Sequence, residues 1–165
     1  MERLNFTIGK GTDTNENTRC ELTPNLLIMG GTASGKTTII SNIINELTSK
    51  NNPDELQMIL VDTNTVSFSP FSNLPHLIQP VIKDAKTFPD ILEYLVKEVD
   101  ARYEILKNTK CNSAQKYNQK YPNKMPPIIV VIDEIADIMI ANKGLEVQFV
   151  RFFQAYQREI GRAHV

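Results

Sequence analysis

An apolar run that leads into a glycine-rich loop constrains the fold of this chain more than any other feature. Residues 26–29 are Leu-Leu-Ile-Met, and residues 30–37 have the form G-x-x-x-x-G-K-[ST]. Backbone N–H groups of such a loop converge on a concavity that suits phosphate oxygens, and the following helix points its positive end at the same place. Gly30 and Gly35 allow backbone angles and a close approach that a side chain would block. The pattern predicts a strand, a phosphate-binding loop and a helix.

The residues of this loop form the predicted nucleotide site, which we expect to bind ATP together with Mg²⁺. Its expected binding residues are Gly30, Gly31, Thr32, Ala33, Ser34, Gly35, Lys36, Thr37 and Thr38. Lys36 can reach the outer phosphates, which makes it a candidate catalytic residue, and the Thr37 hydroxyl can hold the metal. The alternative, a glycine-rich turn that binds nothing, is disfavoured because an amphipathic helical pattern follows the loop.

A second motif lies late in the chain. Residues 128–132 form an unbroken apolar run, typical of a strand buried on both faces, and Asp133 and Glu134 follow it. This Walker B pattern is weak alone, since any buried strand can end in an acid, but it is specific when a phosphate-binding loop lies upstream. Asp133 is therefore the predicted Mg²⁺ ligand opposite Thr37, directly or through water.

Glu134 is the predicted catalytic base. A carboxylate that faces the γ-phosphate can polarise an attacking water and accept its proton. Nucleotide kinases and GTPase switches need no base at this position, whereas a hydrolytic motor does, so the pair of acids favours ATP hydrolysis over nucleotide binding alone. The alternative is that Glu134 is a helix N-terminal acid favoured by the helix dipole.

The composition is that of an ordinary soluble globular chain with one domain. Of 165 residues, 41% are hydrophobic and 22% are charged, and the net charge of −1 gives no overall basic footprint for nucleic acid. No apolar run is long enough to cross a bilayer, and no signal peptide is visible. The two cysteines have no metal-ligand spacing, so we expect reduced thiols in a cytoplasmic protein.

Other segments position these motifs. An alternating run within residues 1–24 predicts a β-hairpin, residues 56–61 a second strand, and residues 145–157 a final helix. Asp62, at the end of the second strand, either helps to position water or Mg²⁺ or caps a turn. Thr87 is expected to cap a long helix with a proline in its first turn.

One segment is basic. Residues 107–124 contain five lysines and no acidic residue. This segment either contacts a phosphate backbone or a neighbouring subunit, or is a solvated loop with a short helix, and the second interpretation is favoured.

Several short motifs resemble the FtsK/SpoIIIE family of DNA-pumping motors over nearly the whole chain. The most distinctive is residues 130–139, Val-Val-Ile-Asp-Glu-Ile-Ala-Asp-Ile-Met, at its distance from the phosphate-binding loop. Residues 24–28, 53–56, 60–62, 75–77 and 80–82 also resemble the family. The chain departs from the pattern at Asn25, at Ala33, at residues 63–64, which replace Pro-Lys, and at Ser67, which replaces a glutamate.

The resemblance implies an α/β fold of the RecA-like P-loop NTPase type, with a mostly parallel sheet flanked by helices. It also implies a homo-hexameric ring around double-stranded DNA, with ATP hydrolysis driving DNA translocation in chromosome partitioning and cell division. A conjugation coupling or secretion ATPase of the same superfamily, or a nucleotide-binding module without hydrolysis, are the alternatives.

We expect residues 1–159 to be a partial ATPase domain that is incomplete at its C-terminus, with residues 1–24 as a lead-in hairpin. The family continues into a strand that lies between the P-loop strand and the Walker B strand. Residues 160–165 are expected to be a non-native tail, because residues 159–165 can be encoded by a common sequencing-library adapter apart from its first base. A fragment of this kind would be marginally stable and a poor ATPase, and any anchor in the inner membrane would belong to segments of the parent protein outside this chain.

Overall fold

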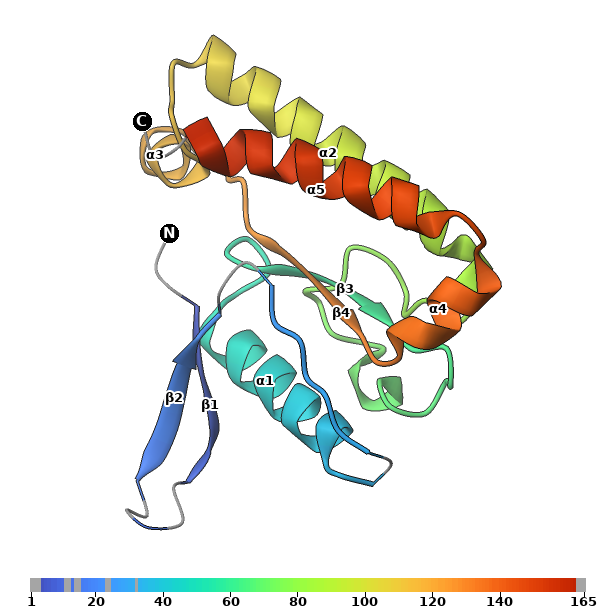
Figure 1. Cartoon of the computed structure of the whole chain (residues 1–165). Helices are drawn as coiled ribbons and strands as arrows, with labels where there is room; N and C mark the ends of the chain where they lie inside the picture. Colours follow the sequence, from blue (N-terminus) through green and yellow to red (C-terminus); the bar gives the residue numbers. More distant parts are fainter. Residues whose placement is uncertain (1–3, 11–12, 14–15, 23–24, 32, 163–165) are drawn as a thin grey trace.

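Two adjacent parallel strands, β3 and β4, form the centre of the chain (Figure 1). The computed structural model describes residues 4–10, 13, 16–22, 25–31 and 33–162, with side chains as far as residue 154. The strands are β1 (Asn5–Lys10), β2 (Asn17–Glu21), β3 (Gln57–Val61) and β4 (Ile128–Ile132). The helices are α1 (Lys36–Lys50), α2 (Phe88–Asn108), α3 (Ala114–Lys120), α4 (Ile135–Ala141) and α5 (Leu145–Arg162), with the short 3₁₀ turns η1 (Ser69–Phe71) and η2 (Ala85–Thr87).

The register of the central pair brings the ends of the two strands level. Gln57 lies opposite Ile128 and Val61 lies opposite Ile132, so the residues that follow both strands emerge at one edge of the sheet. On its other side β3 makes two isolated parallel bridges, from Met58 to Leu77 and from Val61 to Ile82. The segment around Leu77 and Ile82 therefore pairs with β3 only through single bridges.

The two faces of the central pair carry separate apolar cores, because successive strand residues point to opposite sides. Met58 and Leu60 face α1, whereas Ile59 and Val61 face α2 and α5. The α1 core contains Phe6, Ile40, Ile43, Ile44, Leu47, Leu56, Met58, Leu60, Phe68 and Phe71. The α2 core contains Ile59, Val61, Ile82, Phe88, Ile91, Leu92, Leu95, Ile138 and Leu145. The pair is thus covered by helices on both faces, as in α/β proteins.

The N-terminal strands β1 and β2 pair antiparallel and lie against α1 (Figure 1). Phe6 is only 2% exposed and joins the α1 core. The Thr7 main-chain N–H donates to Glu46 Oε2 at 2.6 Å, which ties the hairpin to the helix by a hydrogen bond to a charged acceptor.

On the opposite face, α2 and α5 lie side by side (Figure 1). The rings of Phe88 and Phe149 are 5.7 Å apart and join the two helices near the start of α2. Thr87 is the N-cap residue of α2, as predicted, but its hydroxyl donates to the Asp84 carbonyl and makes no side-chain cap bond to the helix. In the described part of the chain, no helix is both long enough and apolar enough to cross a membrane.

The structure corrects two expectations about the sheet. Residues 26–29, predicted as the strand before the phosphate-binding loop, form no ladder, and Leu27 and Met29 are 74% and 81% exposed. All five residues of β4 are half-buried, not buried on both faces as predicted. Both differences have one cause: within the described residues, the edge of β4 away from β3 has no paired strand, so neither segment is covered by a neighbour.

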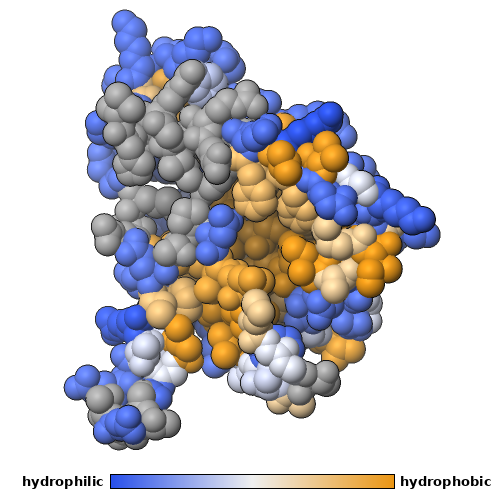
Figure 2. All heavy atoms as spheres, viewed as in Figure 1, coloured by the Kyte–Doolittle hydropathy of each residue, from blue (hydrophilic) through white to orange (hydrophobic). Residues whose placement is uncertain are grey.

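Apolar side chains consequently remain at the surface. Figure 2 shows the molecule from the same side as Figure 1, and on this face apolar residues gather in a hollow. Large apolar side chains that are exposed include Leu26, Leu27 and Met29 before the phosphate-binding loop, and Val147, Val150 and Phe153 of α5.

Candidate phosphate and metal site

The phosphate-binding loop is a tight turn that leads directly into α1. The Ser34 N–H donates to the Gly31 carbonyl at 3.2 Å, and Gly35, at φ +89°, is the N-cap of the helix. A left-handed cap is easily adopted by glycine, and it leaves the N–H groups of the first helical turn without side-chain acceptors. These N–H groups and the helix dipole favour an anion at the start of α1.

A side chain at Gly30 would displace the Ser34 hydroxyl within the loop. A Cβ atom at this position would lie 2.4 Å from Ser34 Oγ, which is far inside van der Waals contact. Lys36 folds back over the loop, where its ammonium donates to the carbonyls of Gly30 and Gly31 at 2.9 Å each. These two hydrogen bonds hold the Lys36 ammonium against the turn at the start of α1.

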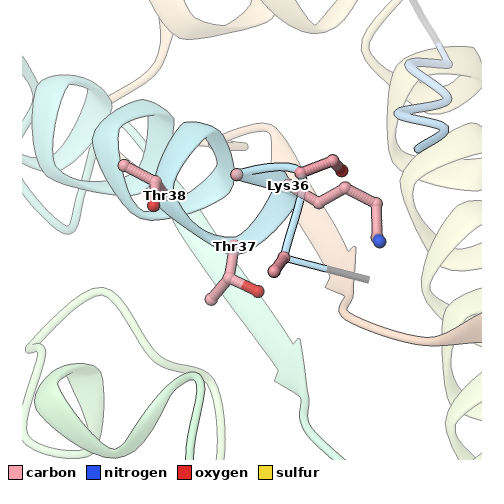
Figure 3. A pocket seen from close by; sticks show the side chains of 6 residues that line it. Lys36, Thr37 and Thr38 are labelled. Carbon is pink, nitrogen blue, oxygen red and sulfur yellow. The ribbon is translucent and has the colours of Figure 1, made fainter. Parts of the chain in front are cut away.

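The residues of the loop surround a hollow at the start of α1 (Figure 3). Its lining consists of Ala33, Ser34, Gly35, Lys36, Thr37 and Thr38. Its volume of about 240 Å³ lies below the roughly 300–1,000 Å³ of pockets that enclose a whole small molecule. The hollow is therefore of a size for phosphate groups. Thr32, also predicted for this site, lies outside the described residues.

Asp133 follows β4 at the carboxyl edge of the sheet. Its main-chain N–H donates to the Val61 carbonyl at 3.1 Å, so the chain stays paired to β3 one residue beyond the strand. Its carboxylate is half-buried, and Oδ2 accepts a hydrogen bond from Ser67 Oγ at 2.8 Å. Figure 1 shows the carboxyl ends of β3 and β4 on the same side of the molecule as the N-terminal end of α1.

The donor set fits Mg²⁺. The Thr37 hydroxyl and the Asp133 carboxylate offer the hard oxygen ligands that this ion prefers. Across the described residues, no three His, Cys, Asp or Glu side chains come together to hold a metal by themselves.

Glu134 is the N-cap of α4. Its Oε1 accepts from the Ala136 N–H at 3.3 Å, and its side chain is half-buried. This is the arrangement expected of a helix N-terminal acid. The distance exceeds the usual 2.7–3.2 Å range, so the cap is a weak hydrogen bond. The role of Glu134 as a catalytic base stays a prediction.

Asp62 caps a turn, which is one of the two roles that the sequence left open. The side chain is 1% exposed, and Oδ2 accepts from the Phe68 N–H at 2.8 Å. Buried His76 stabilises the neighbouring loop, with Nε2 2.7 Å from the Asn51 carbonyl oxygen.

Sequence reasoning missed the hydroxyl groups of the segment after β3. Ser67 bonds to Asp133, and Thr63 Oγ1 donates to Asp137 Oδ2 at 2.9 Å. Both hydroxyls stand at or near positions where the sequence departs from the family pattern that it resembles. This departure was the signal in the sequence that could have indicated these bonds. Where charged residues of the family pattern are replaced, the surrounding side chains must find other partners.

The basic segment is largely engaged within the chain. Lys107 pairs with Glu104 at 3.4 Å, and Lys124 donates to the carbonyls of Asn118 and Tyr121. Lys120 lies over the Tyr121 ring, 5.4 Å from its centre. These contacts stabilise α3 and its loops, as the favoured interpretation of a solvated loop with a short helix implies.

Comparison with known proteins shows what this chain is similar to. The model of the FtsK/SpoIIIE family matches residues 2–163. The DNA translocase FtsK of Helicobacter pylori (strain ATCC 700392 / 26695) is 38% identical over 130 residues, which are 76% of this chain and 15% of the relative. The DNA translocase SftA of Bacillus subtilis (strain 168) is 35% identical over 137 residues, 79% of this chain and 14% of the relative.

Solved structures share the fold. The conjugation coupling protein TcpA of pCW3 superposes with a TM-score of 0.72 at 24% identity, over 98% of this chain and 46% of TcpA. The cytoplasmic domain of the Thermomonospora curvata type VII secretion ATPase EccC gives a TM-score of 0.77 at 22% identity, over 98% of this chain and 20% of EccC. The predicted α/β class is confirmed, and the sheets formed by the described residues have two strands each. The chain spans about a seventh of the curated relatives it matches.

Proposed function

This chain belongs to the FtsK/SpoIIIE family, and from that premise we propose that it is part of an ATP-hydrolysing motor that translocates double-stranded DNA. The relatives of known name are DNA translocases, and the family model matches residues 2–163, which include the phosphate-binding loop and the Walker B acids. In the parent protein, hydrolysis would serve chromosome partitioning and cell division. Residues 1–159 would contribute the first part of the motor domain.

The observation that carries the proposal is the arrangement of the loop and the acidic strand end. The N-terminal end of α1, where the hollow lies, and the carboxyl ends of β3 and β4 are on the same side of the molecule (Figure 1), and Asp133 directly follows β4. The loop N–H groups would bind the phosphates of ATP, and Thr37 and Asp133 would hold Mg²⁺. A Mg²⁺ ion held there would supply positive charge next to the outer phosphates.

Two side chains would change partners during the reaction. Lys36 would leave the carbonyls of Gly30 and Gly31 for the outer phosphate oxygens. Glu134 would leave its weak cap on Ala136 and orient a water for attack. Both side chains are half-buried and lie outside the two apolar cores, so neither exchange requires a core residue to move.

The assembled motor is proposed as a homo-hexamer around DNA on the cytoplasmic side of the membrane. The named neighbour EccC was solved as a cytoplasmic domain, which supports this location. Any anchor in the inner membrane would come from segments of the parent protein outside this chain.

Replacing Glu134 by Gln tests hydrolysis. The amide keeps the size of the carboxylate but cannot accept a proton, so the parent protein with E134Q should bind ATP with unchanged affinity and retain it. Its turnover should fall by about 10²–10⁴-fold, the usual contribution of a positioned base. Single-turnover measurements with and without double-stranded DNA give both values.

The control for this test is Glu146→Gln, which removes an exposed carboxylate from the first turn of α5. This variant should hydrolyse ATP at the rate of the unaltered protein. An unaltered protein without turnover, in which E134Q changes neither ATP binding nor ATP retention, would support a module that binds nucleotide without hydrolysing it. Turnover that survives E134Q would show that Glu134 is not the base. Turnover that DNA does not stimulate would point to a coupling or secretion ATPase.

A further inference from the structure

The turn that follows β3 is fixed at both ends by buried groups. It starts at Asp62, whose carboxylate is 1% exposed, and it ends at Phe68, whose ring is fully buried in the α1 core. The Phe68 N–H donates to Asp62 Oδ2 at 2.8 Å and closes the turn. The Thr65 N–H donates back to the Asp62 carbonyl at 3.2 Å. The path of residues 62–68 is therefore determined by the core.

This turn contains two energetically unfavourable features. Thr65 has φ +64°, a left-handed conformation that is rare for a β-branched residue. Asp62 Oδ1 is buried and has no hydrogen-bond partner among the described residues. Strained backbone and unsatisfied polar atoms persist where surrounding structure imposes them, and they concentrate at functional sites. The turn is thus a place to look for a functional constraint.

The strained turn places Ser67 beside Asp133, the acid of the Walker B motif. Ser67 Oγ donates to Asp133 Oδ2 at 2.8 Å across 66 positions of sequence. Val66 is 75% exposed, so the chain points outward immediately before Ser67 and turns back. In the described part of the chain, the other oxygen, Asp133 Oδ1, accepts no hydrogen bond and stays available to a ligand.

We propose that Ser67 is a positioning residue for the metal site, holding Asp133 in the rotamer that presents Oδ1 to Mg²⁺. The inference rests on the proposed function, because it concerns the same nucleotide site. A carboxylate with one oxygen fixed by a hydroxyl loses little rotamer freedom when its second oxygen enters a metal shell. Groups that orient a metal ligand in this way typically contribute 10–100-fold to metal affinity.

A matched contact in the same turn supplies the control. Thr63 Oγ1 donates to Asp137 Oδ2 at 2.9 Å, so it also ties the turn to the segment after β4 with a hydroxyl–carboxylate bond. Asp137 lies in α4 and is not a predicted metal ligand. Thr63→Val removes this bond at nearly constant side-chain volume and leaves the Ser67–Asp133 bond in place.

The experiment measures nucleotide binding by the chain without relying on turnover. Calorimetry with ATP at increasing Mg²⁺ gives the Mg²⁺ concentration for half-maximal enhancement of ATP binding, and a series in excess chelator gives the metal-free affinity. In Ser67→Ala the half-maximal Mg²⁺ concentration should rise about 10-fold. It should stay near the unaltered value in Ser67→Thr and lie between the two in Ser67→Cys, whose thiol is a weak donor. Metal-free ATP affinity should be the same throughout, and T63V should match the unaltered chain.

Several outcomes would overturn the inference. An unchanged Mg²⁺ requirement in S67A would show that Asp133 is oriented without the serine. Equal losses in S67A and T63V, or a loss of metal-free ATP binding in S67A, would assign the serine a merely structural role. If S67A fails to fold, the comparison of Ser67→Thr with Ser67→Cys decides. A positioning donor requires a lower half-maximal Mg²⁺ concentration in the Thr variant than in the Cys variant, and equal values would overturn the inference. An unaltered chain that binds no ATP with or without Mg²⁺ would instead remove the proposed function, and this inference with it.

Discussion

Ala33 adopts a backbone conformation that an alanine side chain disfavours. Its φ of +61° lies in the left-handed region, one position before the Ser34 N–H bond that closes the phosphate-binding turn. The left-handed conformation costs an alanine about 1–2 kcal/mol, because Cβ crowds the following carbonyl oxygen. The loop thus carries strain at a position where glycine would carry none.

Replacing Ala33 by Gly should therefore stabilise the chain. Part of the strain relief is offset by the greater freedom of glycine in the unfolded chain, so we expect a net gain of about 0.5–1 kcal/mol in the free energy of unfolding. Urea denaturation measures it. The same change at Ala101, an exposed position inside α2, should instead cost about 1 kcal/mol. If both variants lose stability equally, Ala33 is not strained.

At the scale of elements, the hairpin and α1 are joined through one carboxylate. Glu46 accepts from the Thr7 N–H at 2.6 Å and from the Thr7 hydroxyl at 3.3 Å, and it pairs with Lys50 on its own helix. The hydrogen bond from Lys50, followed by the bond from the Thr7 backbone, lowers the pKa of Glu46 below its ordinary value of 4.5. The attachment of β1 is consequently linked to pH.

Acidification should loosen the hairpin from α1. Because the pKa of Glu46 is lower in the folded chain than in the unfolded one, its contribution is fully present well above pH 4.5 and is lost as the pH falls through the folded value. Hydrogen exchange of the Thr7 amide should therefore accelerate, relative to core amides of β3, as the pH decreases below 4.5. Glu46→Gln should make this ratio independent of pH over the same interval. Persistence of the pH effect in E46Q would place its origin elsewhere.

At the scale of the whole molecule, an unpaired edge and an apolar surface lie together. Among the residues that the structure describes, the edge of β4 away from β3 has no paired strand and offers backbone groups to an extended chain, and exposed apolar residues surround the hollow shown in Figure 2. Such surfaces promote association between copies of a chain. The isolated 165 residues should accordingly aggregate readily.

Charge on the segment before the phosphate-binding loop should reduce this association. Leu27 and Met29 are 74% and 81% exposed, so replacing both by Glu should change the free energy of unfolding by less than about 1 kcal/mol in total. Light scattering at increasing protein concentration should show less aggregate than the unaltered chain. Exchanging Leu27 and Met29 for Ile and Leu, which keeps the surface apolar, is the control and should leave aggregation unchanged. Equal aggregation in the Glu and control variants would show that this segment is not the surface through which copies of the chain associate.

Local patterns were enough to predict much of the fold and of the site. Helix α1, strands β3 and β4, and the hollow lined by Lys36 and Thr37 follow from periodicity and from a motif of eight positions. The state of residues 26–29 could not be predicted in this way, because an apolar run becomes a strand only if a neighbour pairs with it. The Ser67–Asp133 hydrogen bond could not be predicted either, since it joins positions 66 residues apart through a strained turn.

The folded-back lysine has a kinetic consequence. Since the Lys36 ammonium already holds the Gly30 and Gly31 carbonyls, an arriving nucleotide competes with the polypeptide for this cation. Loading is then an exchange of partners instead of a simple capture, and its association rate should fall below that of an open, preformed pocket. The carbonyls of Gly30 and Gly31 are therefore weak competitors of the nucleotide phosphates for Lys36.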